Sequence, residues 1–383
     1  PWSPPAWLKR DEAPHQTMDG SSYPGCIKDG TSNSKYAETW AQYFSKWISS
    51  FQNLTSVNVY AVTVQNEPTN VDAIWEGCYY NAQQEKDFVS NYLSPILKRD
   101  FEESIQILGW DYNMKGALPY AQELLATDDM NTSPPAVNLV DGIALHWYSD
   151  GPDEAGLWGG LGSANVHRLN EQLSALNKQI LDTEACHCPS TGYALGDLNE
   201  SWWRGERYAH AIMSRLASGS TGFIEWNMIL DSIGGPNHAD NLCDAPIIAV
   251  PNRARDEEHV GDSDVLMIPT LPDFEHHSMK KGEMIVGNHL SLSQLNEVMG
   301  YNEDYLKEGL VVQPMFYYMG HISKFVTRGS TPLNAIVDSS ETYTFASLEN
   351  KGGKNGNARD GMELNLWPCE GSSRQSWNWD SKK

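Results

Sequence analysis

Five short apolar segments alternate with amphipathic stretches along the first two-thirds of the chain. They begin near residues 57, 105, 140, 179 and 222, about 35 to 50 residues apart. Each has the length of a β-strand, and the stretches between them carry the 3.6-residue periodicity of helices. Strands and helices that alternate at this spacing form parallel sheets. The sequence therefore predicts the α/β class.

The predicted helices span residues 36–51, 83–99, 119–126, 164–177, 202–217 and 314–326. The first is the clearest, because its aromatic and aliphatic residues recur at i, i+3, i+4, i+7, i+8 and i+11. Pro95 is expected to bend or split the second helix. Pro119 is expected in the first turn of the third, where a proline is tolerated.

Polar and aromatic residues gather where the predicted strands end. They are Asn66-Glu67, Asp111, His146-Trp147-Tyr148, Glu184 and Trp226-Asn227. Enzymes with a (β/α)8 TIM barrel carry their active sites at the carboxyl ends of the strands, so this pattern favours a barrel over an open doubly wound sheet. Five strands are visible where a barrel has eight. We therefore expect the first strands to be missing and the chain to be truncated at its N-terminus.

Two regions lie outside the strand and helix pattern. Residues 252–309 are acidic and aperiodic, and we interpret them as an insertion between the last strand and last helix, either a lid or a disordered loop. The predicted barrel domain thus covers residues 1–330. Residues 331–383 form a predicted small C-terminal β segment, in which residues 361–380 resemble one repeat of a ricin-type lectin trefoil. The alternative is a strand remnant that packs on the barrel.

Charge limits the classes of partner. The net charge of -23 argues against nucleic acid, which requires basic patches. It suits a hydrolase that is secreted or acts in a lysosome or vacuole. Glycosylation triplets at Asn53, Asn131 and Asn199 point the same way. No apolar run approaches the ~20 residues that span a bilayer, so no transmembrane segment is predicted.

The six cysteines do not suggest a metal centre. Cys186-His187-Cys188 has the composition of a zinc half-site, but no second Cys/His pair with metal spacing accompanies it. We predict no metal and no cofactor. Core thiols, or one or two disulfides, are the expected use of these residues.

Two carboxylates at the ends of different strands can carry out retaining glycoside hydrolysis. Glu67 is the candidate acid/base and Glu184 the candidate nucleophile. Three other carboxylates compete with them. Asp111 could bind a sugar hydroxyl, Asp182 would lie deeper on the face of Glu184, and Glu225 would point away from the face of Trp226.

The substrate-binding candidates adjoin these two glutamates. Asn66 can donate a hydrogen bond to the sugar 2-hydroxyl. Four aromatic residues, namely Trp2, Trp147, Tyr148 and Trp226, could stack on a pyranose ring. Core packing is the alternative role of a tryptophan such as Trp2.

Several blocks together resemble glycoside hydrolase family 30, and most closely its glucosylceramidase branch. They are WSPPAWLK at Trp2, AVTVQNEP at Ala61, GIALHWY at Gly142, TEAC at Thr183, EWNMILDSIGGPN at Glu225, DAPII at Asp244 and QPMFYYMGHISKF at Gln313. The resemblance implies a retaining β-glucosidase, whose substrate is a β-glucoside or a glucosylceramide presented at a lipid surface. It also implies that Asn241 lines the glucose pocket and that His146 lies behind it.

Two alternatives stay open at this stage. One is an endo-acting β-1,6-glucanase or galactanase of the same family, although the GGPN and DAPII blocks favour the lipid-glucoside branch. The other is a non-catalytic carbohydrate-binding protein, suggested by the missing strands and the lectin-like end.

Overall fold

The computed structural model describes residues 1–10, 26–71, 75–126, 135–148, 160–188, 191–192, 198–237, 239, 241–249, 309–338, 343–349 and 362–365. All structural features given below lie within these ranges. None of the helices in them combines the length and apolar content needed to cross a membrane.

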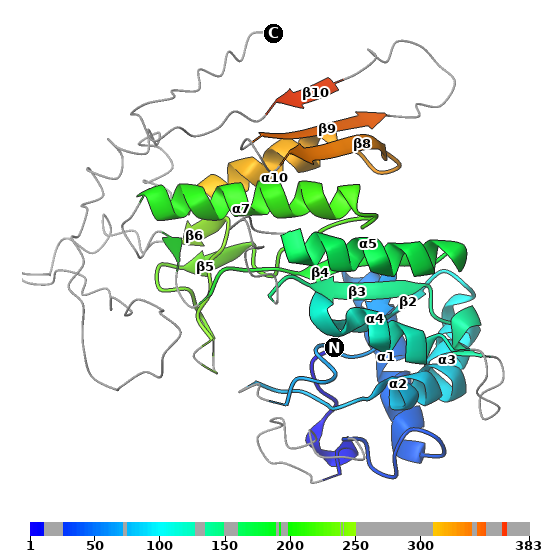
Figure 1. The fold of residues 1–383 in the computed structure, drawn as a ribbon. Helices are drawn as coiled ribbons and strands as arrows, with labels where there is room; N and C mark the ends of the chain where they lie inside the picture. The colour runs from blue at the N-terminus through cyan, green and yellow to red at the C-terminus, as the bar shows by residue number, and fades with distance from the viewer. Residues whose placement is uncertain are drawn as a thin grey trace, which may run out of the picture.

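A curled sheet of four parallel strands forms the centre of the molecule (Figure 1). Its order follows the sequence: β1 (Ala61–Thr63), β2 (Gln106–Asn113), β3 (Gly142–His146) and β4 (Gln179–Glu184). Because the strands are parallel, their carboxyl ends lie at one edge of the sheet. The α/β prediction is confirmed, and this edge is where the polar residues gather.

Two strand predictions were too long. The segment that begins at Val57 is a strand only over β1, and Val57 is 55% exposed. Within the described part of the chain β1 is paired with β2, and no second strand there covers this segment. The predicted strand at 222–227 is reduced to one parallel bridge, between Asp182 and Phe223, after which the chain leaves β4.

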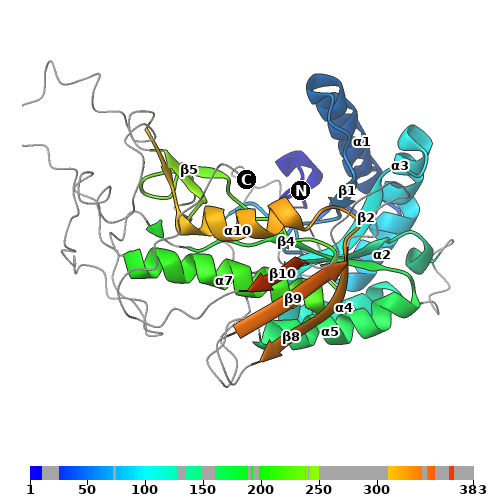
Figure 2. The same cartoon turned by 90° about the horizontal axis from the view of Figure 1, so that it is seen from above.

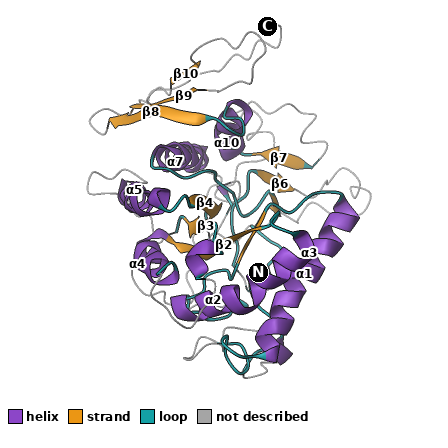
Figure 3. Cartoon of the chain, turned by 90° about the vertical axis from the view of Figure 1, so that its right-hand side faces the viewer, coloured by secondary structure: helices purple, strands orange, loops and turns teal. Residues whose placement is uncertain are grey.

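Helices surround the sheet, as Figure 3 shows. α1 (Lys35–Thr55) begins at Ser34, whose side chain accepts hydrogen bonds from the Tyr36 and Ala37 amides. Its inner face buries an apolar stripe that includes Phe44 and Ile48, and each such side chain contributes about 1.5–3 kcal/mol when fully buried. The remaining long helices are α4 (Met114–Leu124), α5 (Gly160–Ala175), α7 (Leu198–Ala217) and α10 (Pro314–Phe325).

The two proline predictions had different outcomes. The second predicted helix is divided into α2 (Ala82–Phe88), a π-helical turn (Val89–Leu93) and α3 (Ser94–Phe101), with Pro95 in the first turn of α3. The division expected at Pro95 is therefore confirmed. Pro119 lies inside α4 rather than in its first turn, because that helix begins at Met114. Short 3-10 turns occur at Ala6–Leu8 and Ala136–Asn138.

Two further sheets follow the parallel strands in the sequence. β5 (Ile229–Asp231) is parallel to β6 (Ile247–Ala249), which is antiparallel to β7 (Leu310–Val312). The last three strands, β8 (Thr331–Asp338), β9 (Tyr343–Glu349) and β10 (Met362–Asn365), form an antiparallel sheet in the order β10-β9-β8. Figures 1 and 2 both show this sheet beside α7 and α10.

The domain division stays a prediction. The insertion at 252–309 lies outside the described residues except for Gly309, and so does most of the lectin-like segment at 361–380.

A bulge in β2 brings Asp111 to the edge of the sheet. Trp110 and Asp111 have positive φ angles of 72° and 55°, and the register with β3 shifts between Trp110 and Tyr112. The Trp110 amide donates a hydrogen bond to Glu85 on α2, at 3.1 Å. Glu85 also accepts a hydrogen bond from Tyr120, at 2.7 Å. This buried carboxyl therefore stabilises the bulge that positions Asp111.

Because Glu85 is buried, we expect the free energy of unfolding to depend on pH. Burial raises its pKa from 4.5 to about 7, although hydrogen bonds from Tyr120 and Trp110 oppose the rise. Above pH 4.5 the unfolded chain ionises this group while the folded chain keeps it protonated. Stability therefore falls between pH 4.5 and 7, by about 3 kcal/mol for this one group. Below pH 4.5 the group is protonated in both states, and above pH 7 it is ionised in both.

Urea denaturation at pH 5 and pH 7.5 tests this prediction. Glu85→Gln keeps the shape of the side chain and removes its titration, so the variant is expected to lose less stability than the wild type across this interval, by about 3 kcal/mol. An equal loss in both proteins would contradict the assignment.

Candidate functional site: two glutamates around a buried histidine

The chain beyond β1 turns sharply at Glu67. The Glu67 amide donates to the carbonyl of Asp111 at 2.9 Å, and the Asn66 amide donates to the carbonyl of Pro1 at 2.8 Å. The φ angle of Glu67 is 48°, in the left-handed region that few non-glycine residues adopt. Tertiary hydrogen bonds thus hold the candidate acid/base in an unusual backbone conformation at the carboxyl edge of the sheet.

Two neighbouring strands supply the other central residues. β3 ends at His146, and β4 ends at Glu184. The register between these strands shifts at Leu145/His146, so that His146 pairs with Glu184. This irregularity places the imidazole beside the end of β4.

The structure brings the two candidate glutamates together. One carboxylate oxygen of Glu67, one ring nitrogen of His146 and one carboxylate oxygen of Glu184 all lie within 4.8 Å of one another. In retaining glycosidases the two carboxyl groups are about 5–5.5 Å apart, whereas inverting enzymes leave about 6.5–9.5 Å for a water molecule. The spacing here fits the retaining arrangement.

His146 is a buried cation among three carboxylates. Its Nδ1 lies 3.3 Å from Oε1 of Glu67 and 3.9 Å from Oε1 of Glu184, and its Nε2 lies 3.2 Å from Oδ1 of Asp111. Burial alone lowers the pKa of His146, but its hydrogen bonds to Asp111 and Glu67 and the nearby negative charges raise the pKa overall to about 10. The ring is therefore protonated at neutral pH and donates from both nitrogens.

Asp111 anchors this histidine. Burial opposes its ionisation, but the hydrogen bond and charge of His146, together with the hydroxyls of Thr63 and Thr183, leave the pKa of Asp111 below its usual value. Those hydroxyls donate to Asp111 at 2.6 and 2.7 Å. The sequence suggested a sugar-binding role for Asp111. In the structure its oxygens bind protein groups instead.

Glu184 lies in a setting that opposes its ionisation. Burial raises its pKa to about 7, while the charge of His146 and a hydrogen bond from Tyr148 lower it. The Tyr148 hydroxyl lies 2.9 Å from Oε1 of Glu184. We predicted that Tyr148 would stack on the sugar. The structure shows that its hydroxyl donates to the candidate nucleophile, and the stacking role stays a prediction.

Three tryptophans lie side by side near the end of β4, which carries Glu184. The ring of Trp2 is 5.6 Å from that of Trp226 and 6.1 Å from that of Trp75. The Trp226 amide donates to the carbonyl of Ala185, which follows Glu184 directly, at 2.9 Å. Sequence reasoning identified Trp2 and Trp226 but missed Trp75, because Trp75 lies in a loop without periodicity or a strand-end motif.

The family model for the glycosyl hydrolase family 30 TIM-barrel domain matches residues 1–257. The chain belongs to glycosyl hydrolase family 30. Family membership confirms both the resemblance stated above and the TIM-barrel fold class. The four parallel strands of the described residues are thus part of a family 30 barrel.

Relatives within family 30 differ in the activity that their names state. The chain is 27% identical over 360 residues to the lysosomal acid glucosylceramidase of Mus musculus, covering 92% of this chain and 54% of that protein. It is 29% identical over 247 residues to endo-1,6-beta-D-glucanase BGN16.3 of Trichoderma harzianum, covering 63% and 42%. The chain spans about half the length of the curated relatives it matches.

Solved structures support the fold. SrfJ from Salmonella typhimurium matches with a TM-score of 0.62 at 23% identity, over 96% of this chain and 66% of that one. At this identity the likeness bears on the fold alone.

Two residues of the family 30 chain lie elsewhere than expected. Trp147 was predicted to stack on the sugar, but it is 1% exposed and packs on Tyr208 of α7 in the core. Asp182 was predicted to share the face of Glu184, but it pairs with Arg215 of α7 at 2.5 Å. The register shift at the end of β4 explains this, because one extra residue reverses the alternation of side chains.

Glu225 is not part of the group formed by Glu67, His146 and Glu184. Both its oxygens are buried, and burial raises its pKa well above the ordinary value. That Glu225 points away from the face of Trp226 stays a prediction.

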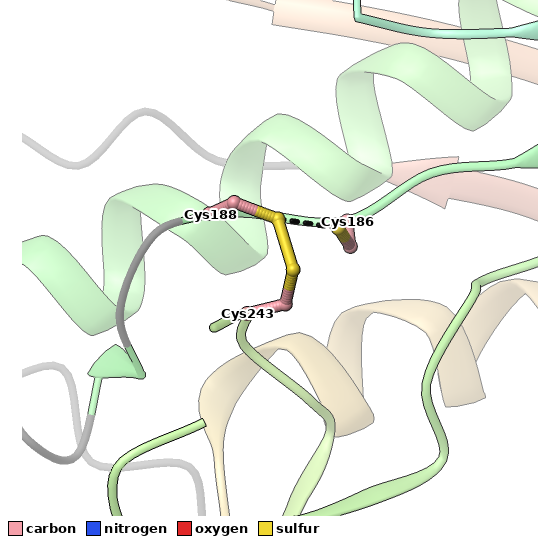
Figure 4. A group of neighbouring side chains, drawn as sticks. All are labelled: Cys186, Cys188 and Cys243. Atoms are coloured by element: carbon pink, nitrogen blue, oxygen red, sulfur yellow. Dashed lines mark hydrogen bonds between the residues drawn. A yellow bond between two sulfur atoms is a disulfide. The ribbon is translucent and has the colours of Figure 1, made fainter. Parts of the chain in front are cut away.

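Asn241 lies in a loop that a disulfide joins to the end of β4. Cys188, four residues after Glu184, is bonded to Cys243, two residues after Asn241 (Figure 4). The Asn241 amide donates to Oδ1 of Asn237 at 3.3 Å. These contacts fix the loop backbone near β4, the strand that carries Glu184. The role of Asn241 in binding sugar stays a prediction.

Two groups of side chains have the composition of a metal site, one of three cysteines and one made of the two glutamates and the histidine. Sulfur atoms of Cys186, Cys188 and Cys243 lie within 4.8 Å of one another, as do ligand atoms of Glu67, His146 and Glu184. Two of the three sulfurs share a disulfide, and both nitrogens of His146 face carboxylates. With the disulfide formed and the histidine bound to carboxylates, neither group presents three free ligands. A second disulfide joins Cys26 to Cys78.

The two disulfides provide a matched pair for a test. They close loops of similar length, with sequence separations of 52 and 55, so removing either by paired serine substitution is expected to cost about 4 kcal/mol of stability. Only Cys188→Ser/Cys243→Ser is expected to lower kcat as well, by about tenfold, because Cys188 follows the nucleophile strand. Urea denaturation and kcat on an aryl β-glucoside measure both effects. Equal kcat values in the two double variants would contradict this role.

Proposed function

We propose that this chain is a retaining β-glycosidase that hydrolyses glucosylceramide-like β-glucosides by double displacement. The observation that carries the proposal is the separation of at most 4.8 Å between oxygens of Glu67 and Glu184. In the first step protonated Glu67 gives its proton to the glycosidic oxygen while ionised Glu184 attacks the anomeric carbon. In the second step Glu67 takes a proton from water, which attacks the glycosyl-enzyme and releases the sugar.

The surrounding groups suit these steps. The His146 cation and the Tyr148 hydroxyl stabilise the negative charge that Glu184 needs for attack. Asn66 is the candidate donor to the sugar 2-hydroxyl, and the rings of Trp2, Trp75 and Trp226 offer apolar faces for a pyranose. Two glutamates at catalytic spacing also favour catalysis over a purely sugar-binding role.

An amphiphilic aglycone is the substrate class we favour. The segment after Trp226 exposes Met228, Ile229 and Ile233 by 74%, 48% and 44%. Exposed apolar side chains that follow Trp226 so soon in the sequence fit a lipid chain or a lipid surface better than a water-soluble glucan. The glucosylceramidase name of the mouse relative points in the same direction.

The proposal includes the cellular compartment of the protein. Two disulfides suit an oxidising compartment, which supports secretion or a lysosomal or vacuolar location, and a place in sphingolipid metabolism follows from the substrate. Thiol labelling of protein taken from cells without reduction is expected to leave Cys26, Cys78, Cys188 and Cys243 unlabelled. Labelling of all four would contradict the secretory route.

The substrate experiment compares a lipid glucoside with a glucan. We expect the protein to release glucose from glucosylceramide in vesicles and to release no oligosaccharide from a β-1,6-glucan. Met228→Ser/Ile229→Ser is expected to raise KM for the vesicle substrate and to leave KM for a short aryl β-glucoside unchanged. Oligosaccharide release without glucosylceramide turnover would instead support the endo-β-1,6-glucanase, the activity named for the Trichoderma relative.

A further inference from the structure

Both carboxylate oxygens of Glu67 have a partner within the protein. Oε1 faces Nδ1 of His146 at 3.3 Å, and Oε2 accepts a hydrogen bond from Nδ2 of Asn70 at 2.6 Å. Glu67 is 7% exposed, so these contacts are shielded from most competition with water. The histidine is a cation, whereas the asparagine is a neutral amide with both donor and acceptor atoms.

A short turn fixes Asn70 against Glu67. The Asn70 amide donates to the carbonyl of Glu67 at 3.0 Å, and the carbonyl of Pro68 accepts from the Tyr80 amide at 2.9 Å. The left-handed φ of Glu67 starts this turn. The backbone therefore holds the Asn70 side chain next to one particular oxygen, Oε2, through both steps of any reaction at Glu67.

Double displacement makes opposite demands on Glu67. The group must be protonated when the leaving oxygen departs and ionised when water attacks. The NH2 of an amide donates to an ionised carboxylate oxygen and also to the hydroxyl oxygen of a protonated carboxyl, whose own proton then points toward the glycosidic oxygen. A neutral amide can thus bind Oε2 in both protonation states without itself gaining or losing a proton.

We propose that Asn70 is a positioning residue for the acid/base, holding Oε2 of Glu67 through Nδ2 in both its protonated and its ionised form. The proposal rests on the function proposed above. The proton moves only between Glu67 and the glycosidic oxygen in the first step, and between water and Glu67 in the second. Asn70 orients the carboxyl group so that these transfers occur from a fixed position.

Asn70→Asp tests the proposal because it replaces the amide donor to Oε2 with a carboxylate of similar shape. Two carboxylates at this distance share one proton, which favours the protonated form of Glu67. The first step is then retained and the second is slowed. For aryl β-glucosides we expect kcat to fall about 10- to 100-fold and to become independent of the leaving group. Azide, which needs no general base, is expected to restore turnover and give the β-glucosyl azide.

Two controls separate this role from a loss of structure. Asn81→Asp makes the same change in charge at the N-cap of α2, where aspartate caps as well as asparagine, so its kinetics are expected to match the wild type. Asn70→Leu has a similar size but neither donor nor acceptor, so it is expected to lower kcat without the leaving-group independence.

The outcomes are decisive. An unchanged kcat in Asn70→Asp, or a lower kcat that azide does not restore and that still depends on the leaving group, overturns the proposal for Asn70 while the wild type remains an active glycosidase. A wild-type protein that turns over no aryl β-glycoside overturns the proposed function, and this inference with it.

Discussion

Glu184→Gly is expected to lower kcat for an activated aryl β-glucoside by about 10⁴-fold, because the variant has no group to attack the anomeric carbon. Azide should restore turnover by occupying the space of the lost carboxylate, and the product should be the α-glucosyl azide. The anomer follows from the face of attack, since a single displacement by azide inverts the β-linkage.

Glu67→Ala is expected to respond differently to the same reagent. The first step still proceeds with a good leaving group, but hydrolysis of the glycosyl-enzyme slows without its general base. Azide then attacks that intermediate from the opposite face and gives the β-glucosyl azide. Product anomers are read by NMR, and Glu103→Gly, at an exposed site, serves as the control. Swapped anomers would reverse the roles assigned to the two glutamates.

Arg215→Met is expected to lower the free energy of unfolding by about 3–5 kcal/mol. Arg215 and Asp182 form an ion pair at 2.5 Å with side chains 0% and 1% exposed, so removing the cation leaves a carboxylate buried without its countercharge. The hydroxyl of Ser220, which donates to Asp182 at 2.6 Å, remains after the substitution. Because a marginally stable domain has only about 5–15 kcal/mol in total, this loss is large.

A second substitution should recover this stability. Arg215→Met/Asp182→Leu removes both charges, and apolar replacement of a buried pair is often neutral. Lys98→Met, at the exposed pair with Glu103, is expected to leave stability unchanged. Urea denaturation at one pH measures all three. A double variant as unstable as Arg215→Met alone would show that packing, not the buried charge, causes the loss.

Much of the fold was predictable because strands and helices have different periods. The four strands that form the parallel sheet were each anticipated, and β4 matches its predicted range at both ends. Boundaries failed where tertiary pairing decides them. β1, paired with β2 alone in the described part of the chain, is shorter than its predicted strand, and the segment at 222–227 formed one bridge with β4 rather than a strand.

The sequence by itself determined which acids could meet, because parallel strands bring their carboxyl ends to one edge and Glu67 and Glu184 follow two such strands. Only the tertiary structure decided where the other side chains point. Single-residue shifts in register sent Asp182 to Arg215, and cysteine pairing and the contact between Asn70 and Glu67 depend on distances that spacing along the chain does not specify. The physical reason is that a strand alternates its two faces residue by residue, so one bulge reverses everything beyond it.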